Sequence, residues 1–207
     1  MSIALALTPA ETALGVSLPH RRMEEWRWTD LRQMIDKPYP PRQKVKAKAG
    51  DVERLVATSL FAGVAATRMV FVNGEYDAAL SKQANGWVES TAELSDPVNL
   101  MNVAFATDGA RLKIEGNVDT PIELVFIATN DVPRTVATRN VIEVADDASA
   151  TIIETHLGEG SYLASAVTEI RIGHNARLDR IKVELESHDA VHLAHCHVIV
   201  GQNVTFR

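Results

Sequence analysis

Cysteine is nearly absent from this sequence of 207 residues, which contains Cys196 and no other cysteine. A single thiol cannot form a disulfide within the chain, nor can it supply the four thiolates of a zinc or iron-sulfur site. Any chemistry that needs several thiolates must therefore be shared with partner chains. Because no secretory signal is recognisable either, we expect a cytoplasmic protein in a reducing compartment.

Aromatic residues are also scarce, at 5% of the chain, whereas apolar residues make up 46%. The core must therefore rest mainly on Val, Ile, Leu and Ala, which favours many short aliphatic strands. No stretch approaches the roughly 20 apolar residues that a membrane span requires. The net charge of -6 gives no reason to expect a nucleic-acid-binding protein.

Several motifs of well-known enzymes are missing. The sequence has no GxxxxGKS/T phosphate-binding loop, no GxSxG nucleophile elbow and no HExxH metal motif. It also has no glycine-rich dinucleotide fingerprint. These motifs therefore provide no catalytic residue, and none is predicted.

The front of the chain contains three segments with helical patterns. Thr8-Pro9-Ala10-Glu11 has the form of a capping box with proline at the first helical position, which predicts a helix start. A second helix is expected near His20 to Ile35. A third is expected to run to about Leu60 with Asp51 as its N-cap. We therefore predict a small helical region over residues 1–66.

Residues 67–107 are expected to connect this region to the rest of the chain. Met69 to Val72 has the composition of a strand, and Asn73-Gly74 predicts a tight turn because both residues tolerate positive φ. Asp96 followed by Pro97 predicts the start of a short helix that reaches about Thr107. The segment therefore reads as a hairpin and a short helix.

Residues 108–207 contain a repeat. Each of four segments has two aliphatic residues two positions apart, then an Asn or Asp, then Ala or Val. The segments are Leu112–Val118, Ile142–Ala148, Ile170–Ala176 and Val198–Val204. Their turn residues, Asn117, Asp147, Asn175 and Asn203, are 30, 28 and 28 residues apart.

The repeat predicts a stack of strands. Aliphatic residues two apart share one face of a strand, and Asn or Asp tolerates the left-handed backbone of a turn. A period of about 28 residues that supplies two strands and two turns is typical of a solenoid. The fold class is therefore predicted as mainly β, a parallel β-helix preceded by the small helical region. The alternative is a sandwich or jelly roll with evenly spaced strands.

Histidines gather near the end of the chain. The group consists of His188, His192, His195, Cys196 and His197. On a strand, His195 and His197 share a face and could bind zinc, iron or copper, with a third ligand from Glu154 or His156. The alternative is that these imidazoles are only exposed or hydrogen-bonded, since the ligand set is incomplete. Cys196 points the other way and is expected to be a small buried residue.

Four stretches in the same order resemble the SufB/SufD family. They are LPHRRMEEWRWTDL at 18–31, FVNG at 71–74, NLMNVAFATDG at 99–109 with Pro121-Ile122 downstream, and IETH at 153–156. The resemblance implies that the β-helix is right-handed. It also implies that residues 108–207 are a core truncated at the C-terminus, because family members continue with further turns and a helical part that docks SufC.

The resemblance implies a function as well. The family acts in the SUF system of iron-sulfur cluster assembly, with SufB and the ATPase SufC as partners. The chain would then be a non-catalytic scaffold rather than an enzyme, and ATP hydrolysis would belong to SufC. No cofactor is required by this chain alone, and an iron-sulfur species or a flavin would be bound only in the full complex. No functional residue of the family is carried over.

Two further expectations complete the sequence analysis. The alternative function is a metal-dependent, cupin-like β-barrel enzyme that uses His195 and His197. A carbohydrate-active β-helix enzyme is less favoured, because this sequence has no recognisable carboxylate cluster. A solenoid cut between turns would expose an unpaired strand edge, which can pair with another chain. We therefore expect a homo-oligomer formed through the C-terminal edge, near Val198, Val200, Val204 and Phe206.

Overall fold

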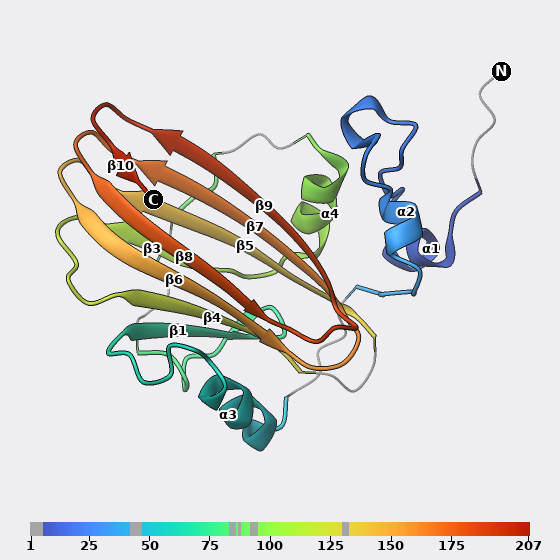
Figure 1. The fold of residues 1–207 in the computed structure, drawn as a ribbon, viewed down its shortest axis with the longest axis horizontal. Helices are drawn as coiled ribbons and strands as arrows, with labels where there is room; N and C mark the ends of the chain where they lie inside the picture. Colours follow the sequence, from blue (N-terminus) through green and yellow to red (C-terminus); the bar gives the residue numbers. More distant parts are fainter. Residues whose placement is uncertain (1–5, 42–46, 83–85, 87, 92–94, 130–132) are drawn as a thin grey trace.

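The structure, a computed structural model, describes residues 6–41, 47–82, 86, 88–91, 95–129 and 133–207. It is mainly β, a parallel solenoid of about three turns with a few helices at its N-terminal side (Figure 1). The predicted fold class is therefore confirmed. None of the helices among the described residues is long and apolar enough to cross a membrane.

The solenoid consists of two sheets between which the chain alternates. One sheet has the order β10-β8-β6-β4-β1-β2 and the other the order β3-β5-β7-β9. The first sheet contains β1 (Thr67–Val72), β2 (Glu75–Tyr76), β4 (Ile122–Ala128), β6 (Ser149–Gly158), β8 (Arg177–Leu185) and β10 (Thr205–Phe206). The second contains β3 (Arg111–Ile114), β5 (Thr135–Val144), β7 (Leu163–Ile172) and β9 (Val191–Val200).

Strand direction excludes the alternative folds. Among the described residues, every pairing of these strands except the β1–β2 hairpin is parallel. A sandwich or jelly roll is built from antiparallel strands. Both sheets also have free outer strands, so the cupin-like barrel of the alternative function is not present.

The sequence repeat corresponds to the register of the second sheet. Leu112, Ile142, Ile170 and Val198 are successive partners across β3, β5, β7 and β9. The predicted second strands of each period are β6 and β8, which also pair with a shift of 28 residues, as in Ala150 opposite Leu178. Each period therefore forms one turn of the solenoid.

The turn positions behave as the repeat predicts in three of four cases. Asp147, Asn175 and Asn203 have φ values of 59°, 57° and 57°, in the left-handed region. Their side chains also form a ladder, since Asn175 donates to Asp147 at 3.1 Å and Asn203 donates to Asn175 at 3.2 Å. Asn117 is not among the described residues with positive φ. It accepts a hydrogen bond from Ser149 instead.

The main core lies between the two sheets. Its rows come from the inward positions of successive strands, for example Leu124, Ile142, Ile152 and Ile170, all of which are completely buried. Burial of each such side chain contributes about 1.5–3 kcal/mol. Gly109, just before β3, permits the close stacking of turns. A Cβ there would lie 2.1 Å from the carbonyl oxygen of Arg139.

The helices cover the outer faces of the sheets. α1 (Pro9–Leu14), α2 (Leu31–Met34) and α4 (Pro97–Phe105) contribute to one apolar cluster with Leu163 of β7. α3 (Ala49–Ala57) packs Val52 and Leu55 against β4 and β6. Figure 1 shows α3 beside β1 and β4, and α4 on the other side of the solenoid. At the end of the stack formed by β8, β9 and β10, no helix of the described residues lies over the strands (Figure 1).

Three of the predicted local signals are confirmed. Thr8 and Glu11 form the capping box of α1, with hydrogen bonds in both directions. Asp96 caps α4 by accepting from two backbone N–H groups, with Pro97 at the first helical position. Asn73 and Gly74 form the turn of the β1–β2 hairpin with φ values of 52° and 85°.

Two helix predictions were wrong in extent. The expected helix over 20–35 is a 3₁₀ turn, η1 (Glu24–Trp26), followed by the short α2. Its apolar residues fit a helical period only loosely, so tertiary contacts rather than periodicity decide its path. The third helix begins after Lys48, which places Asp51 in the first turn rather than at the cap, and it ends at Ala57.

Candidate functional site

The predicted metal ligands His195 and His197 lie on β9, the outer strand of its sheet. His197 is the parallel partner of Glu169, whose carboxylate accepts hydrogen bonds from Thr91 on the outer face. Side chains alternate along a strand, so both histidines face away from the space between the sheets. Within the described part of the chain, no group of metal-ligating side chains includes either of them.

The suggested third ligands, Glu154 and His156, lie on β6 in the opposite sheet and point inward. Glu154 forms two hydrogen bonds with Arg180 of β8, at 2.9 Å and 2.7 Å. The Glu154 side chain is only 2% exposed, so this pairing satisfies a carboxylate that would be costly to bury alone. The structure therefore does not bring Glu154 or His156 together with His195 and His197.

Cys196 points into the interior, toward Arg180, Glu154 and Lys182. It is exposed all the same, because β9 is the outer strand of its sheet within the part of the chain that the structure describes. The prediction of a small buried residue was therefore wrong. The surrounding side chains still desolvate the sulfur, and this desolvation raises the pKa of the Cys196 thiol.

A column of rings crosses the interior from β1 to β6. Phe71, Phe126 and His156 are register partners on successive strands. The Phe71 and Phe126 ring centres are 5.1 Å apart, and those of Phe126 and His156 are 4.8 Å apart. Burial in this column lowers the pKa of His156 well below its usual value, and the nearby His192 and Lys182 act in the same direction. His156 is therefore a neutral imidazole at neutral pH.

The column ends at a group of polar side chains, which we call the lumen cluster: Glu184, Glu186, His192, Lys182, Tyr162 and His156. Glu184 is the register partner of His156 on β8, and Glu186 follows the end of that strand. The ring of His192 meets the ring of His156 edge-on at 4.7 Å. Both sheets and the loop between β8 and β9 therefore contribute to the cluster.

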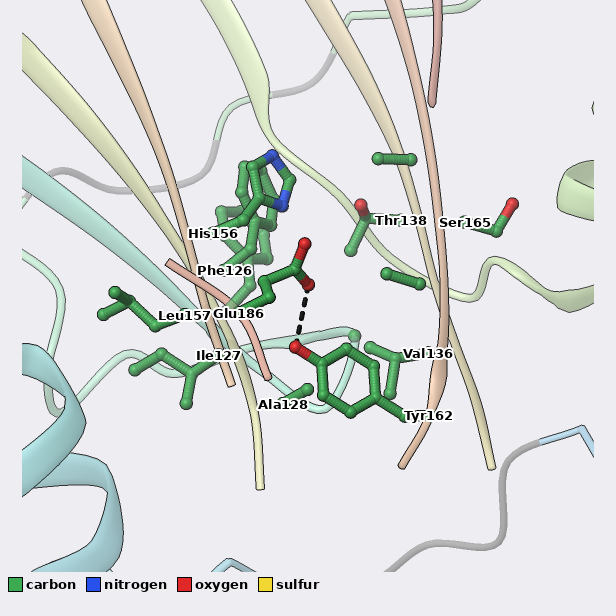
Figure 2. Close-up of a pocket in the computed structure, with 14 residues that line it drawn as sticks. Phe126, Ile127, Ala128, Val136, Thr138, His156, Leu157, Tyr162, Ser165 and Glu186 are labelled. Carbon is green, nitrogen blue, oxygen red and sulfur yellow. Dashed lines mark hydrogen bonds between the residues drawn. The ribbon is translucent and has the colours of Figure 1, made fainter. Parts of the chain in front are cut away.

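The members of the lumen cluster are closely connected. The Tyr162 hydroxyl donates to Glu186 at 2.8 Å, and Glu186 lies 2.6 Å from Nδ1 of His192. The Lys182 ammonium lies 2.5 Å from Glu184 and 2.9 Å from Nε2 of His192. Figure 2 shows the Tyr162–Glu186 hydrogen bond next to the stacked rings of His156 and Phe126. Glu186 and His156 also line a cavity of about 20 Å³, room for about one water molecule.

Sequence reasoning noted His192 and His156 but missed their association with Glu184 and Glu186. The alternation Lys182-x-Glu184-x-Glu186 was a usable signal, since residues at this spacing share one face of a predicted strand. The 28-residue period would then have placed Glu184 beside His156. What the sequence did not reveal is that the loop after β8 returns His192 to the same place.

Part of this sequence matches the model of a known protein family. Residues 126–207 match the family model described as "SUF system FeS cluster assembly, SufBD core domain". The resemblance to the SufB/SufD family is confirmed. The matched region begins within β4 and includes every later strand and the whole lumen cluster.

Two curated relatives extend the similarity over most of the chain. The iron-sulfur cluster assembly SufBD family protein slr0076 of Synechocystis is 24% identical over 93% of this chain and 49% of its own length. The iron-sulfur cluster assembly protein SufD of Escherichia coli is 24% identical over 93% of this chain and 48% of its own length. The chain therefore spans about half the length of these relatives.

Proposed function

We propose that the chain acts in iron-sulfur cluster assembly as a non-catalytic scaffold that works with SufB and the ATPase SufC. The observation that carries the proposal is the match of the SufBD core domain to residues 126–207, which here form the stacked turns of a parallel solenoid. A solenoid end with exposed strands suits a scaffold, because it offers backbone groups and apolar side chains to a partner. ATP hydrolysis would belong to SufC.

The surface proposed for the partner is the end formed by β8, β9 and β10. Ile199 and Val200 on β9 are 46% and 54% exposed, and Phe206 on β10 is 39% exposed. Large apolar side chains at this exposure, on strands with unpaired edges, are typical of interaction surfaces. SufB would bind there, whereas the contact with SufC would belong to parts of the relatives that this chain does not span.

Co-expression of the chain with SufB and SufC from the same source tests the proposal. SufB should co-purify with the chain, and Ile199→Lys should reduce its recovery at least fivefold by placing a charge in the contact. Leu60→Lys is the matched control, since Leu60 is 67% exposed and lies between Ser59 and Phe61, which bond to Glu123 of β4 and Arg68 of β1, far from β9. Equal recovery of SufB with both variants would refute the surface, and no recovery at all would refute the partnership.

A further inference from the structure

The lumen cluster contains an arrangement typical of a metal-binding histidine. One ligand atom from each of Glu184, Glu186 and His192 lies within 4.8 Å of the others. Glu186 is itself fixed by the hydroxyl of Tyr162 and contacts Nδ1 of His192. Metal-bound histidines commonly donate their second ring N–H to a carboxylate in this way, which fixes the tautomer. The lone pair on Nε2 of His192 is then directed away from Glu186.

The ammonium of Lys182 already lies where the lone pair on Nε2 of His192 is directed. The Lys182 ammonium lies between Nε2 of His192 and the carboxylate of Glu184, and those two atoms are 3.5 Å apart. The ammonium has no acceptor, so it donates to Nε2 of His192 in this contact. The carboxylate of Glu184 and Nε2 of His192 therefore both contact one cation, the ammonium of Lys182.

A second, independent observation concerns the side chain packed against His192. His156 is 4% exposed, its ring meets that of His192, and its Nε2 is buried without a hydrogen-bond partner among the described residues. Buried polar atoms are normally paired, and an orphaned one needs an explanation. In Figure 2 the His156 imidazole lies beside the cavity that it shares with Glu186.

We propose that this is a binding site for a divalent transition-metal ion, with Glu184 and Nε2 of His192 as ligands and the buried imidazole of His156 against the ring of His192. Glu186 and Tyr162 are positioning residues that hold His192, and the ion displaces the Lys182 ammonium. An imidazole ligand suits ferrous iron or zinc better than magnesium or calcium. The inference stands on these side chains alone, so it does not depend on the proposed scaffold function.

Titration of the metal-free chain with Zn²⁺ by calorimetry tests the proposal, and Co²⁺ absorption reports the ligand geometry. We expect one strong site, at least tenfold weaker in His192→Gln and in Glu184→Gln. Glu186→Gln should weaken it about 10–100-fold through loss of orientation. Lys182→Met should tighten binding at least tenfold, because the competing charge is gone, and a misfolded variant could not produce this gain.

His195→Gln and His197→Gln are the matched controls, because they remove imidazoles from the outer face of the same strand. Both should bind within twofold of the unmodified chain. Absence of a one-to-one site in both the unmodified chain and Lys182→Met would overturn the proposal. So would loss of binding in the outer-face variants with retention in His192→Gln, which would assign the ion to His195 and His197.

Discussion

Glu169 shows how a single carboxylate is fixed on the outer face of the solenoid. Burial alone would raise the pKa of Glu169, but hydrogen bonds from Ser90, Thr91 and Arg171 outweigh it and lower this pKa to about 2. The side chain is 2% exposed, so these bonds are shielded from water. The ionised form therefore ties the segment at 90–91 to β7.

Glu169→Gln should lower the free energy of unfolding by on the order of 2 kcal/mol at neutral pH. A carboxylate with a depressed native pKa stabilises the fold above its unfolded pKa, and this contribution is lost as pH falls toward about 2. The difference between the variant and the unmodified chain should therefore shrink from pH 5 to pH 3. Urea unfolding at several pH values measures it.

Glu143→Gln is the control for this comparison. Glu143 pairs with the same Arg171, but its side chain is 33% exposed, so the loss should be below about 1 kcal/mol. A constant difference between Glu169→Gln and the unmodified chain from pH 5 to pH 3 would refute the proposed role of ionisation.

At the scale of elements, the turns show how far the sequence predicts structure. The Asn and Asp positions were recognised because few other residues accept a left-handed backbone, and this constraint is local. Asn175 adopts the left-handed backbone with φ 57°, and its side chain also takes part in the hydrogen-bonded ladder of turn residues. The paths of residues 20–35 could not be predicted in the same way. Their short helical turns are fixed by packing of residues such as Leu31 and Ile35 against distant strands.

Two substitutions at Asn175 should separate the effect of backbone strain on stability from the effect of the side-chain hydrogen bonds. Asn175→Gly keeps the left-handed turn and loses the side-chain hydrogen bonds, so we expect a cost of about 1 kcal/mol. Asn175→Ala loses both and should cost about 2 kcal/mol or more. Thermal unfolding measures the order of stability.

Asn117→Ala provides the control at the turn without positive φ. It should cost no more than about 1 kcal/mol, since it removes an exposed hydrogen bond that the Asn117 side chain accepts from Ser149. If the alanine and glycine variants of Asn175 were equally stable, backbone strain would not be the reason for asparagine there.

The candidate site lies beyond the reach of such local rules. The alternation of Lys182, Glu184 and Glu186 is visible in the sequence, but their neighbours His156 and His192 come from β6 and from the start of β9. Whether His192 faces inward depends on where the loop before β9 ends, and a shift of one residue would turn it outward. The sequence could therefore suggest histidine ligands without identifying which ones converge.

At the scale of the whole molecule, the two sheets end differently. On one side, β1 continues the sheet of β4 and α3 packs beside it. On the other, no further described strand pairs with the outer edges of β9 and β10, and Val200 and Phe206 are exposed. The division into 1–66, 67–107 and 108–207 remains a proposal, in which the middle segment joins the solenoid through β1.

For the 207-residue chain we predict self-association through this end at high concentration. Exposed strand edges with apolar side chains can pair with the same edge of a second copy. Val200→Lys should shift the population toward the monomer, whereas Leu60→Lys should leave it unchanged. Light scattering after size-exclusion chromatography measures the mass, and a strictly monomeric unmodified chain would contradict the prediction.

The constant register has a consequence for how such a chain can change in length. Successive turn residues pair at a separation of 28, so a duplicated or deleted unit of that size leaves every remaining row in line. Loss of a single residue within a strand would turn its buried side chains to the opposite face. Over evolutionary time, the solenoid can therefore gain or lose length by whole turns, while single insertions are tolerated mainly in the loops between strands.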